Sequence, residues 1–226
     1  MAVLKKIGPA LIAVALMLSA VSARADLQVF NDAASWSARS IVNGTVNFNG
    51  IAPTGSYVNL GKDFTIGGIV FHADTYGTYV VDSAFNPSLY TNWGTGGGIL
   101  QVGANSTLTM TIPSSSAFSL QLMTFEPFGA TFTISVYNGN TLLATYQVFS
   151  ANYPAPTFFG IGSPDEQMFN KIVITSTGAY QLFDNIAYGI DPPPTNETLV
   201  PEPASFLLLG TGLTGLGYLA RKRVRQ

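Results

Sequence analysis

The chain has 226 residues, no cysteine and a formal net charge of −2, but its charges are unevenly distributed. Seven of the ten basic residues lie near the two ends. Between Asp26 and Leu199, three basic residues stand against eleven carboxylates. So acidic a central region disfavours binding to nucleic acid or anionic lipid, both of which require basic patches. Without disulfides, residues 26–190 must depend on a hydrophobic core, and they suffice for one domain.

The N-terminus has the pattern of a secretory signal peptide, which we predict to span residues 1–25. Met1–Lys6 provides a basic start and Ile7–Val21 an apolar run. Ala23 and Ala25 then provide small residues at positions −3 and −1 of a cleavage site after Ala25. A first transmembrane anchor fits less well, because the run is short and ends in a cleavage motif. The mature chain is therefore expected to be exported and to begin at Asp26.

The central region shows few helix signals and many strand signals. Asp32 is expected to cap a short helix that turns Trp36 inward. The remainder consists of short runs rich in Val, Ile, Thr, Phe and Tyr, separated by Gly, Asn and Pro. Strands are predicted at Thr45–Phe48, Asp63–Ile66, Ile69–His72, Thr78–Val81, Ile99–Val102, Thr107–Ile112, Ala117–Thr124, Thr131–Tyr137, Leu142–Phe149, Lys171–Ser176 and Gln181–Tyr188.

Several of these runs alternate between apolar and polar residues. In "TLTMTI", for example, Leu108, Met110 and Ile112 share one face and three threonines the other. Asn138-Gly139 joins two alternating runs and predicts a hairpin. The fold class we expect is all-β, an antiparallel two-sheet β-sandwich of the jelly-roll type, with an N-terminal signal helix and a C-terminal transmembrane helix. The sandwich is predicted to span residues 26–190 and a Pro-rich linker residues 191–199.

Candidates for catalysis are few. His72 is the only histidine and there is no cysteine, so neither a zinc site nor a Cys–His nucleophile can be assembled. We expect His72 to be a strand-end residue hydrogen-bonded to backbone. A pair of carboxylates is the only enzymatic option, with Asp82, Glu126, Asp165 and Glu166 as candidates. Asp165-Glu166 has the sequence of a solvated turn. We therefore assign no catalytic residue.

Aromatic residues offer more material for binding. Tyr90 and Trp93 lie in "NPSLYTNWGTGGG", beside a run of glycines. Aromatic rings stack on sugar rings, and neighbouring amides and hydroxyls can bind the sugar hydroxyl groups. Trp93 and Tyr90 are our candidate ligand-binding residues, although Trp93 pointing inward as the lid of one end of the sandwich is an equal alternative. Phe158 and Phe159 are expected in the core.

The C-terminus combines three elements in a fixed order. Val200-Pro201-Glu202-Pro203 is followed by Ala204–Ala220, which has no charged or amide side chain and would rise about 26 Å as a helix. This is slightly short of a hydrocarbon core of roughly 30 Å, so insertion into a membrane is marginal. The basic residues that follow should stay on the cytoplasmic side: Arg221, Lys222, Arg223 and Arg225.

This constellation, residues 200–226, resembles the PEP-CTERM sorting tail of Gram-negative bacteria. The resemblance implies that an exosortase, a membrane cysteine transpeptidase, recognises Pro-Glu-Pro, cuts there and removes the helix and basic stub. It also implies an organism that makes exopolysaccharide. An ordinary tail anchor with a coincidental Pro-Glu-Pro is the alternative reading.

A second, shorter resemblance concerns "FNKIVITSTG" and "FDNIAYG", which look like the closing strands of jelly-roll domains in carbohydrate-binding modules and in many PEP-CTERM proteins. It implies that Asp184 helps to hold a structural calcium ion. The alternative is that Asp184 and Asn185 bind backbone N–H groups at a strand edge or bulge. We expect no other cofactor.

Together these features predict an exported envelope or extracellular-matrix protein that binds or organises exopolysaccharide without catalysis. Its expected partners are an exosortase, extracellular polysaccharide and, transiently through the C-terminal helix, the inner membrane. The precursor would hold a periplasmic ectodomain and then release it to the cell surface or medium. A structural or adhesion protein without a sugar site is one alternative, and a carboxylate-dependent glycan-cleaving enzyme is another.

Overall fold

The structure is a computed structural model, and it describes residues 27–87, 97–151 and 156–192. The predicted signal peptide, the candidate residues Tyr90 and Trp93, and the sorting tail lie outside these ranges. Within them, no helix is both long and apolar enough to cross a membrane. The predicted transmembrane helix, residues 204–220, belongs to the part that is not described.

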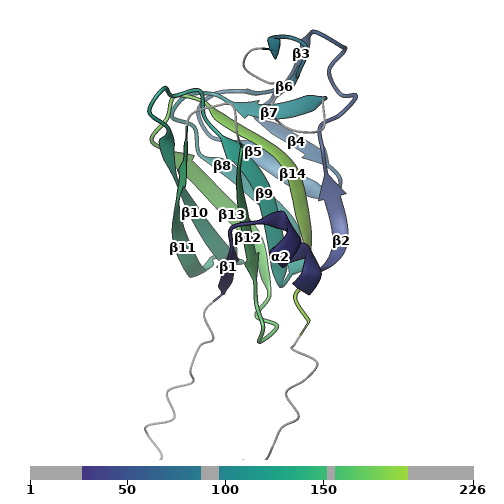
Figure 1. Cartoon of the computed structure of the whole chain (residues 1–226), viewed down its shortest axis with the longest axis vertical. Coiled ribbons are helices and arrows are strands. Elements are labelled where there is room, and N and C mark those ends of the chain that lie inside the picture. The colour runs from purple at the N-terminus through teal and green to yellow at the C-terminus, as the bar shows by residue number, and fades with distance from the viewer. Residues whose placement is uncertain (1–26, 88–96, 152–155, 193–226) are drawn as a thin grey trace, which may run out of the picture. The chain divides into compact units, whose positions relative to one another are not determined.

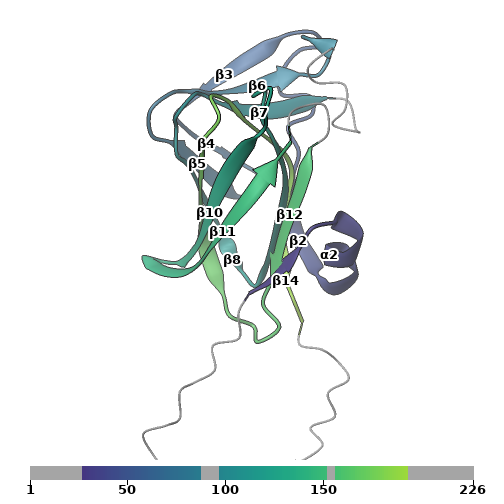
Figure 2. The ribbon, with the colours of Figure 1, turned by 60° about the vertical axis from the view of Figure 1, so that its left-hand side comes forward.

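Two antiparallel sheets form the sandwich (Figures 1 and 2). The larger sheet has the order β1 (Gln28–Phe30), β12 (Thr157–Gly162), β9 (Ala117–Met123), β14 (Gln181–Ile190), β7 (Gly98–Val102), β6 (Thr78–Asp82) and β3 (Tyr57–Gly61), and β2 (Ile41–Val46) also pairs with β14. The smaller sheet has the order β11 (Thr141–Ser150), β10 (Ala130–Asn138), β13 (Phe169–Ser176), β8 (Leu108–Ser115), β5 (Ile69–Ala73) and β4 (Asp63–Ile66). The predicted all-β sandwich is confirmed.

The core lies between the sheets and follows the alternation of the strands. Leu108, Met110 and Ile112 of β8 are buried, as predicted. Phe132 of β10 meets Phe183 of β14 edge to face, with ring centroids 6.1 Å apart, so aromatic contact links the two sheets. Because this core is apolar and continuous, the domain holds together without disulfides.

The predicted hairpin and helix are both present. Strands β10 and β11 join at Asn138-Gly139, where Gly139 has a φ of 58°. Helix α2 (Ala33–Arg39) begins at Asp32, whose carboxylate accepts a 2.8 Å hydrogen bond from the backbone N–H of Ser35. Trp36 turns from the helix toward the larger sheet, as expected. It is buried against the outer face of that sheet, on the side where Figure 2 shows α2.

Three strands were not predicted, and β2 begins earlier than expected. Strand β1 has only three residues, and β3 contains Asn59 and Gly61, which weaken a strand pattern. Strand β12 contains two glycines. One of them, Gly160, lies under the indole of Trp36, and a Cβ there would approach Trp36 Cδ1 to 2.7 Å. This glycine leaves room for the helix to pack on the strand.

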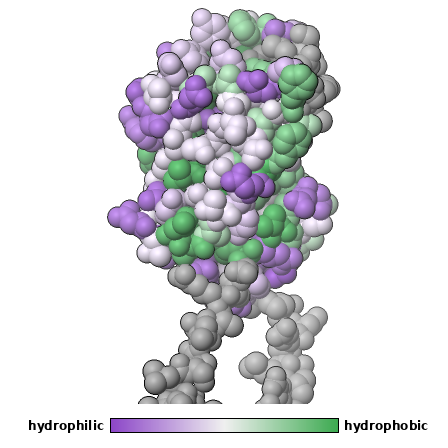
Figure 3. All heavy atoms as spheres, turned by 90° about the vertical axis from the view of Figure 1, so that its left-hand side faces the viewer, coloured by the Kyte–Doolittle hydropathy of each residue, from purple (hydrophilic) through white to green (hydrophobic). Residues whose placement is uncertain are grey.

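The side of the molecule that carries β10 and β11 has a mixed surface. Figure 3 shows pale residues of intermediate hydropathy across much of this side, with hydrophobic and hydrophilic side chains scattered among them. The outward positions of the smaller sheet are largely hydroxyl-bearing, for instance Thr133 facing both Gln147 and Thr175. This face therefore meets water through uncharged polar groups.

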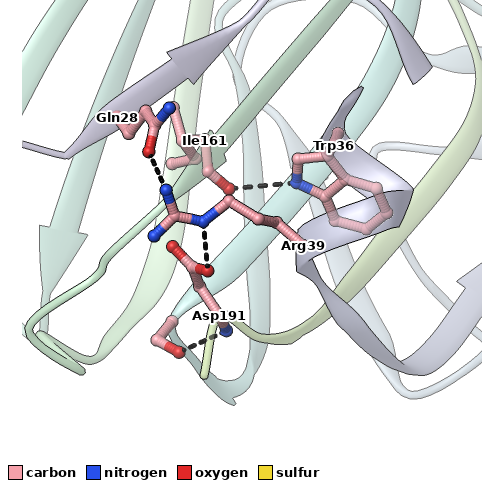
Figure 4. A network of polar contacts seen from close by, with 6 residues as sticks. Gln28, Trp36, Arg39, Ile161 and Asp191 are labelled. Carbon is pink, nitrogen blue, oxygen red and sulfur yellow. Dashed lines mark hydrogen bonds and ion pairs between the residues drawn. The ribbon is translucent and has the colours of Figure 1, made fainter. Parts of the chain in front are cut away.

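A polar network ties the beginning of the domain to its end (Figure 4). Arg39 Nε lies 3.2 Å from Asp191 Oδ1, and Arg39 Nη1 donates to Gln28 Oε1. Trp36 Nε1 donates to the carbonyl oxygen of Ile161 at 3.1 Å. Asp191, which sequence analysis placed first in the linker, is fully buried and donates its backbone N–H to Ser116 Oγ. The network fixes β1, α2 and the end of β14 to one another.

Candidate functional site

The outer face of the larger sheet carries apolar side chains in addition to those of the core. A small cluster of Val81, Ile99, Met123 and Leu182 is buried there, separate from the main core. Tyr79 packs against this cluster and is partly exposed. The outer face of a solvated sheet is usually polar, so this region is the first place to look for a binding site.

An aromatic cleft lies at the end of this face that β3, β6 and β7 form. Its volume is about 280 Å³, and it is lined by Tyr57, Tyr79, Val81, Phe85 and Gln101. Tyr57 meets both other rings edge to face. Its centroid lies 5.9 Å from that of Tyr79 and 5.5 Å from that of Phe85, with interplanar angles of 72° and 80°.

Strand register explains why these rings meet. Tyr57 of β3 lies opposite Val81 of β6, and Tyr79 of β6 lies opposite Gln101 of β7. These positions share one face because residues that are directly opposite point the same way. Tyr57 is 53% exposed and Phe85 49%, whereas Val81 is buried and forms the floor. Large ring surfaces are thus available to a ligand.

Asp82 fixes the turn that carries Phe85. Its Oδ1 accepts hydrogen bonds from the backbone N–H groups of Gly55, at 2.8 Å, and Ala84, at 3.0 Å. The backbone N–H of Phe85 in turn donates to the carbonyl oxygen of Asp82. This carboxylate, which sequence analysis considered as a catalytic candidate, holds two turns together and positions the Phe85 ring beside Tyr57.

The described residues that flank the predicted ligand residues, Tyr90 and Trp93, in the sequence lie near this cleft. Both residues lie outside the described ranges, so the cleft is defined without their contacts. The described flanks meet where Gly97 donates its N–H to Ser83 Oγ and the backbone N–H of Ser83 donates to the carbonyl oxygen of Gly97. Ser83 is two residues from Phe85, so these described flanks lie close to the aromatic cleft.

No charged side chain lines the cleft among the described residues. The three basic residues of the domain are engaged elsewhere: Arg39 with Asp191, Lys62 with the carbonyl oxygen of Asp74, and Lys171 over the ring of Tyr137. A cleft of neutral aromatic rings and one amide gives no electrostatic preference for a charged ligand.

Asp184 lies where β7 stops and β2 starts along β14. The register between β14 and β9 shifts after Asp184, and Asn185 adopts a φ of 50°. Burial raises the pKa of Asp184 to about 6, against hydrogen bonds from the backbone N–H groups of Asn185 and Phe48 that lower it. Its Oδ1 is buried without a hydrogen-bond partner among the described residues.

For Asp184 this geometry agrees with the bulge alternative, whereas the Asn185 side chain donates to Gln121 Oε1 and not to a backbone group. A calcium ion takes six to eight oxygen ligands. The described part of the chain contains no group of three or more His, Cys, Asp or Glu side chains that could hold a metal ion. The structural calcium ion at Asp184 stays a prediction.

The remaining candidates for catalysis lie in turns or contact residues that were not candidates. His72 Nδ1 lies 2.6 Å from Asp63 Oδ1, and both side chains are exposed. His72 therefore contacts a carboxylate, whereas we had expected it to bind a backbone group. Glu126 Oε1 accepts a 2.7 Å hydrogen bond from the backbone N–H of Ala179. Asp165 and Glu166 lie in a turn, as predicted.

Comparison with known families decides the interpretation of the C-terminus. The family model for the PEP-CTERM protein-sorting motif matches residues 199–223. The chain carries a PEP-CTERM sorting motif. A PEP-CTERM motif implies an exported precursor that is anchored in the membrane before processing by an exosortase. No curated protein matches the chain.

Several solved structures are similar to the chain at low identity. A family 29 carbohydrate-binding module from Piromyces equi is 10% identical, with 65% of this chain and 96% of the module covered and a TM-score of 0.35. A family 11 carbohydrate-binding module of a cellulosomal cellulase from Clostridium thermocellum is 9% identical, with 70% and 100% covered and a TM-score of 0.33. A module from a Cellvibrio mixtus lichenase, in complex with cellotriose, is 11% identical, with 61% and 98% covered and a TM-score of 0.29.

Proposed function

We propose that this PEP-CTERM protein is a non-catalytic component of the envelope or extracellular matrix that binds a neutral glycan in the aromatic cleft. The observation that carries the proposal is the uncharged cleft itself, in which the rings of Tyr79 and Phe85 each meet the ring of Tyr57 at roughly a right angle. Exposed rings of this kind bury the apolar faces of sugars, while Gln101 and the two phenol groups supply hydrogen bonds.

The size of the cleft limits what it can hold. Ligand pockets usually measure roughly 300–1,000 Å³, and this one, at about 280 Å³, is at the lower end. We infer that it takes one end or one short stretch of a glycan chain. The acidic character of the domain and the uncharged lining favour a neutral polysaccharide over one with many carboxylates or sulfates.

Export would bring the domain to such a polymer. In our proposal the signal peptide directs the chain across the inner membrane, and the apolar tail holds it there until an exosortase cuts at Pro201-Glu202-Pro203. The mature protein then reaches the cell surface or the medium, where exopolysaccharide accumulates.

Several contacts support a non-catalytic role. Asp82 and Glu126 both bind backbone N–H groups and are thereby committed to holding turns. A glycan-cleaving enzyme would need two carboxylates facing one glycosidic bond. In the cleft, the lining residues that the structure describes include none.

Calorimetric titration of the exported protein tests the proposal, with neutral exopolysaccharide from the producing cells and cello-oligosaccharides as probes. Tyr57→Ala should weaken binding by about 30-fold or more, because a central aromatic ring contributes about 2 kcal/mol or more. Asp82→Ala should weaken it too, by releasing the turn of Phe85. Tyr76→Ala is the matched control, since Tyr76 is 54% exposed but lies outside the cleft.

Three outcomes would contradict the proposal. Unchanged affinity in Tyr57→Ala would show that the glycan binds elsewhere. If the wild-type protein bound none of the neutral probes, the structural or adhesion alternative would replace ours. Release of reducing sugar that Glu126→Gln abolished would instead favour the enzymatic alternative.

A further inference from the structure

The free edges of the two sheets differ greatly in how well they are protected. Strand β1 has three residues, β4 has four and begins with Asp63, and β3 has five with a register shift near its end. Strand β2 has six residues and is interrupted by a bulge opposite Tyr188 and Gly189. Short, charged or bulged edges pair poorly with other chains.

Strand β11 is different. It has ten residues, "TLLATYQVFS", without a charge, a proline or a glycine. Within the described residues it pairs with β10 and with no strand on its other side. Leu142 is 49% exposed and Phe149 62%. Natural proteins protect a long edge strand with lysines, prolines or bulges, and along its seven residues from Ala144 to Ser150 this one has none.

The space beside this edge is also open. A groove of about 450 Å³ runs between β11 and β12, and it is lined largely by apolar and aromatic side chains, among them Val148, Phe149 and Phe158. Figure 2 shows β11 in front of the larger sheet, next to β12. Both the backbone edge and part of the inward side of β11 are therefore accessible from solvent.

We propose that β11 pairs antiparallel with β11 of a second copy of this chain, which would join the two smaller sheets into one continuous sheet. A twofold axis through Gln147 uses all seven regular residues. It places Gln147 opposite itself, Val148 opposite Tyr146 and Phe149 opposite Thr145 of the other copy. Each facing pair then points to the same side of the joined sheet, as native pairing with β10 requires.

Charge limits where two copies of this chain can meet, and the uncharged edge of β11 is a place where they can. The domain has a large acidic excess, so two copies repel one another at most approaches. A twofold axis through Gln147 brings groups that lie near the axis close to their own equivalents, so a charged residue there would face a like charge. The uncharged strand β11 avoids this cost. It offers main-chain hydrogen bonds together with the exposed Phe149 ring.

Such a dimer would leave both aromatic clefts free, because they belong to the larger sheet and are built from β3, β6, β7 and the turn after β6. Two cleft-bearing domains in one particle could engage two glycan chains, or one chain twice, with a gain in avidity. Pairing itself does not depend on the glycan proposal and can be tested without any sugar.

Single cysteines provide the sharpest test, because the chain has none of its own. In the proposed register the two copies of residue 147 have Cα atoms about 4.5–5.5 Å apart, which is within the range of a disulfide. The full chain with Gln147→Cys, exported from the producing cells, should therefore form disulfide-linked dimers. Thr175→Cys is the control. It is exposed on the same face but two strands inward, so the two copies would lie about 24 Å apart.

A second pair of variants tests pairing without crosslinking. Gln147→Lys should shift the exported protein from dimer toward monomer in sedimentation velocity at every concentration, whereas Thr175→Lys should not. A monomeric wild-type protein with equal, slow crosslinking of both cysteine variants would overturn the proposal. So would a dimer that Gln147→Lys leaves intact, which must use another surface. A disulfide that joins the Gln147→Cys variant to a different protein, in place of a second copy, would also overturn it and assign the edge to another partner.

Discussion

Arg39 offers the most direct test of how the domain is closed. Asp191 is buried, and among the described residues its Oδ2 has no hydrogen-bond partner. The hydration that this carboxylate loses is therefore compensated mainly by the contact of Oδ1 with Arg39. Arg39→Ala would leave a buried carboxylate without its cation. Breaking a fully buried ion pair costs about 3–5 kcal/mol. Because the Arg39 side chain is 35% exposed and partly screened, we expect a loss of about 2–3 kcal/mol.

Urea denaturation of the exported protein measures this loss as a change in the free energy of unfolding. For a domain of this size it corresponds to a fall in Tm of roughly 4–12 °C. Arg39→Lys should lose less, because it keeps the charge. Asp191→Asn in the Arg39→Ala background should recover part of the stability by removing the unpaired charge. A loss below about 0.5 kcal/mol in Arg39→Ala would refute the reasoning, since it would mean that water compensates Asp191 as well as arginine does.

Two further predictions concern the buried aspartate and the tail. Because burial raises the pKa of Asp184 from 3.8 to about 6, the folded state binds this proton more tightly than the unfolded state does. The contribution of Asp184 to the free energy of unfolding should therefore fall by about 3 kcal/mol as pH rises from about 4 to above 6. Urea titrations at several pH values should show that the free energy of unfolding depends less on pH in Asp184→Asn than in the wild-type protein. An equal dependence on pH in both proteins would contradict this. Mass spectrometry of the mature protein should detect no peptide spanning Gly210–Arg221. The Glu202→Ala variant, in which the Pro-Glu-Pro motif is lost, should keep this peptide and stay in the membrane fraction.

Much of the sandwich could be predicted because its strands carry their own signals. Strand β8 alternates cleanly, Asn138-Gly139 marks a hairpin, and Asp32 marks the start of α2. These are local features, and each agrees with the fold that forms around it. The strands that were missed are those where tertiary contacts override local pattern. In β12, for example, Gly160 is required by a tryptophan that lies more than a hundred residues earlier in the chain.

The aromatic cleft could not be predicted in the same way. Tyr57 lies on a strand whose asparagine and glycine conceal it, and Phe85 lies in a turn. What brings their rings together is the pairing of β3 with β6 and the hydrogen bonds of Asp82, neither of which has a sequence signature. The available signal was modest: Tyr57 and Tyr79 each stand near the start of a short uncharged run, YVNLG and YVV, and the rings could have been considered beside Tyr90 and Trp93.

The carboxylates show why acidic composition should not be interpreted as a ligand site. Asp32 accepts a hydrogen bond from Ser35, and this backbone contact lowers its pKa. Burial alone would raise the pKa of Asp74, but hydrogen bonds from Thr107 and Thr75 lower it overall. Asp82 and Glu126 also bind backbone N–H groups at turns. With no disulfides, this domain uses carboxylates to link turns that are distant in sequence. For example, Asp74 Oδ1 accepts a 2.7 Å hydrogen bond from the backbone N–H of Thr107.

Asp32 and Asp74 stabilise the fold only while they are ionised. Their contribution to stability should therefore disappear as pH falls below about 3.8, which is opposite in sign to the effect of Asp184.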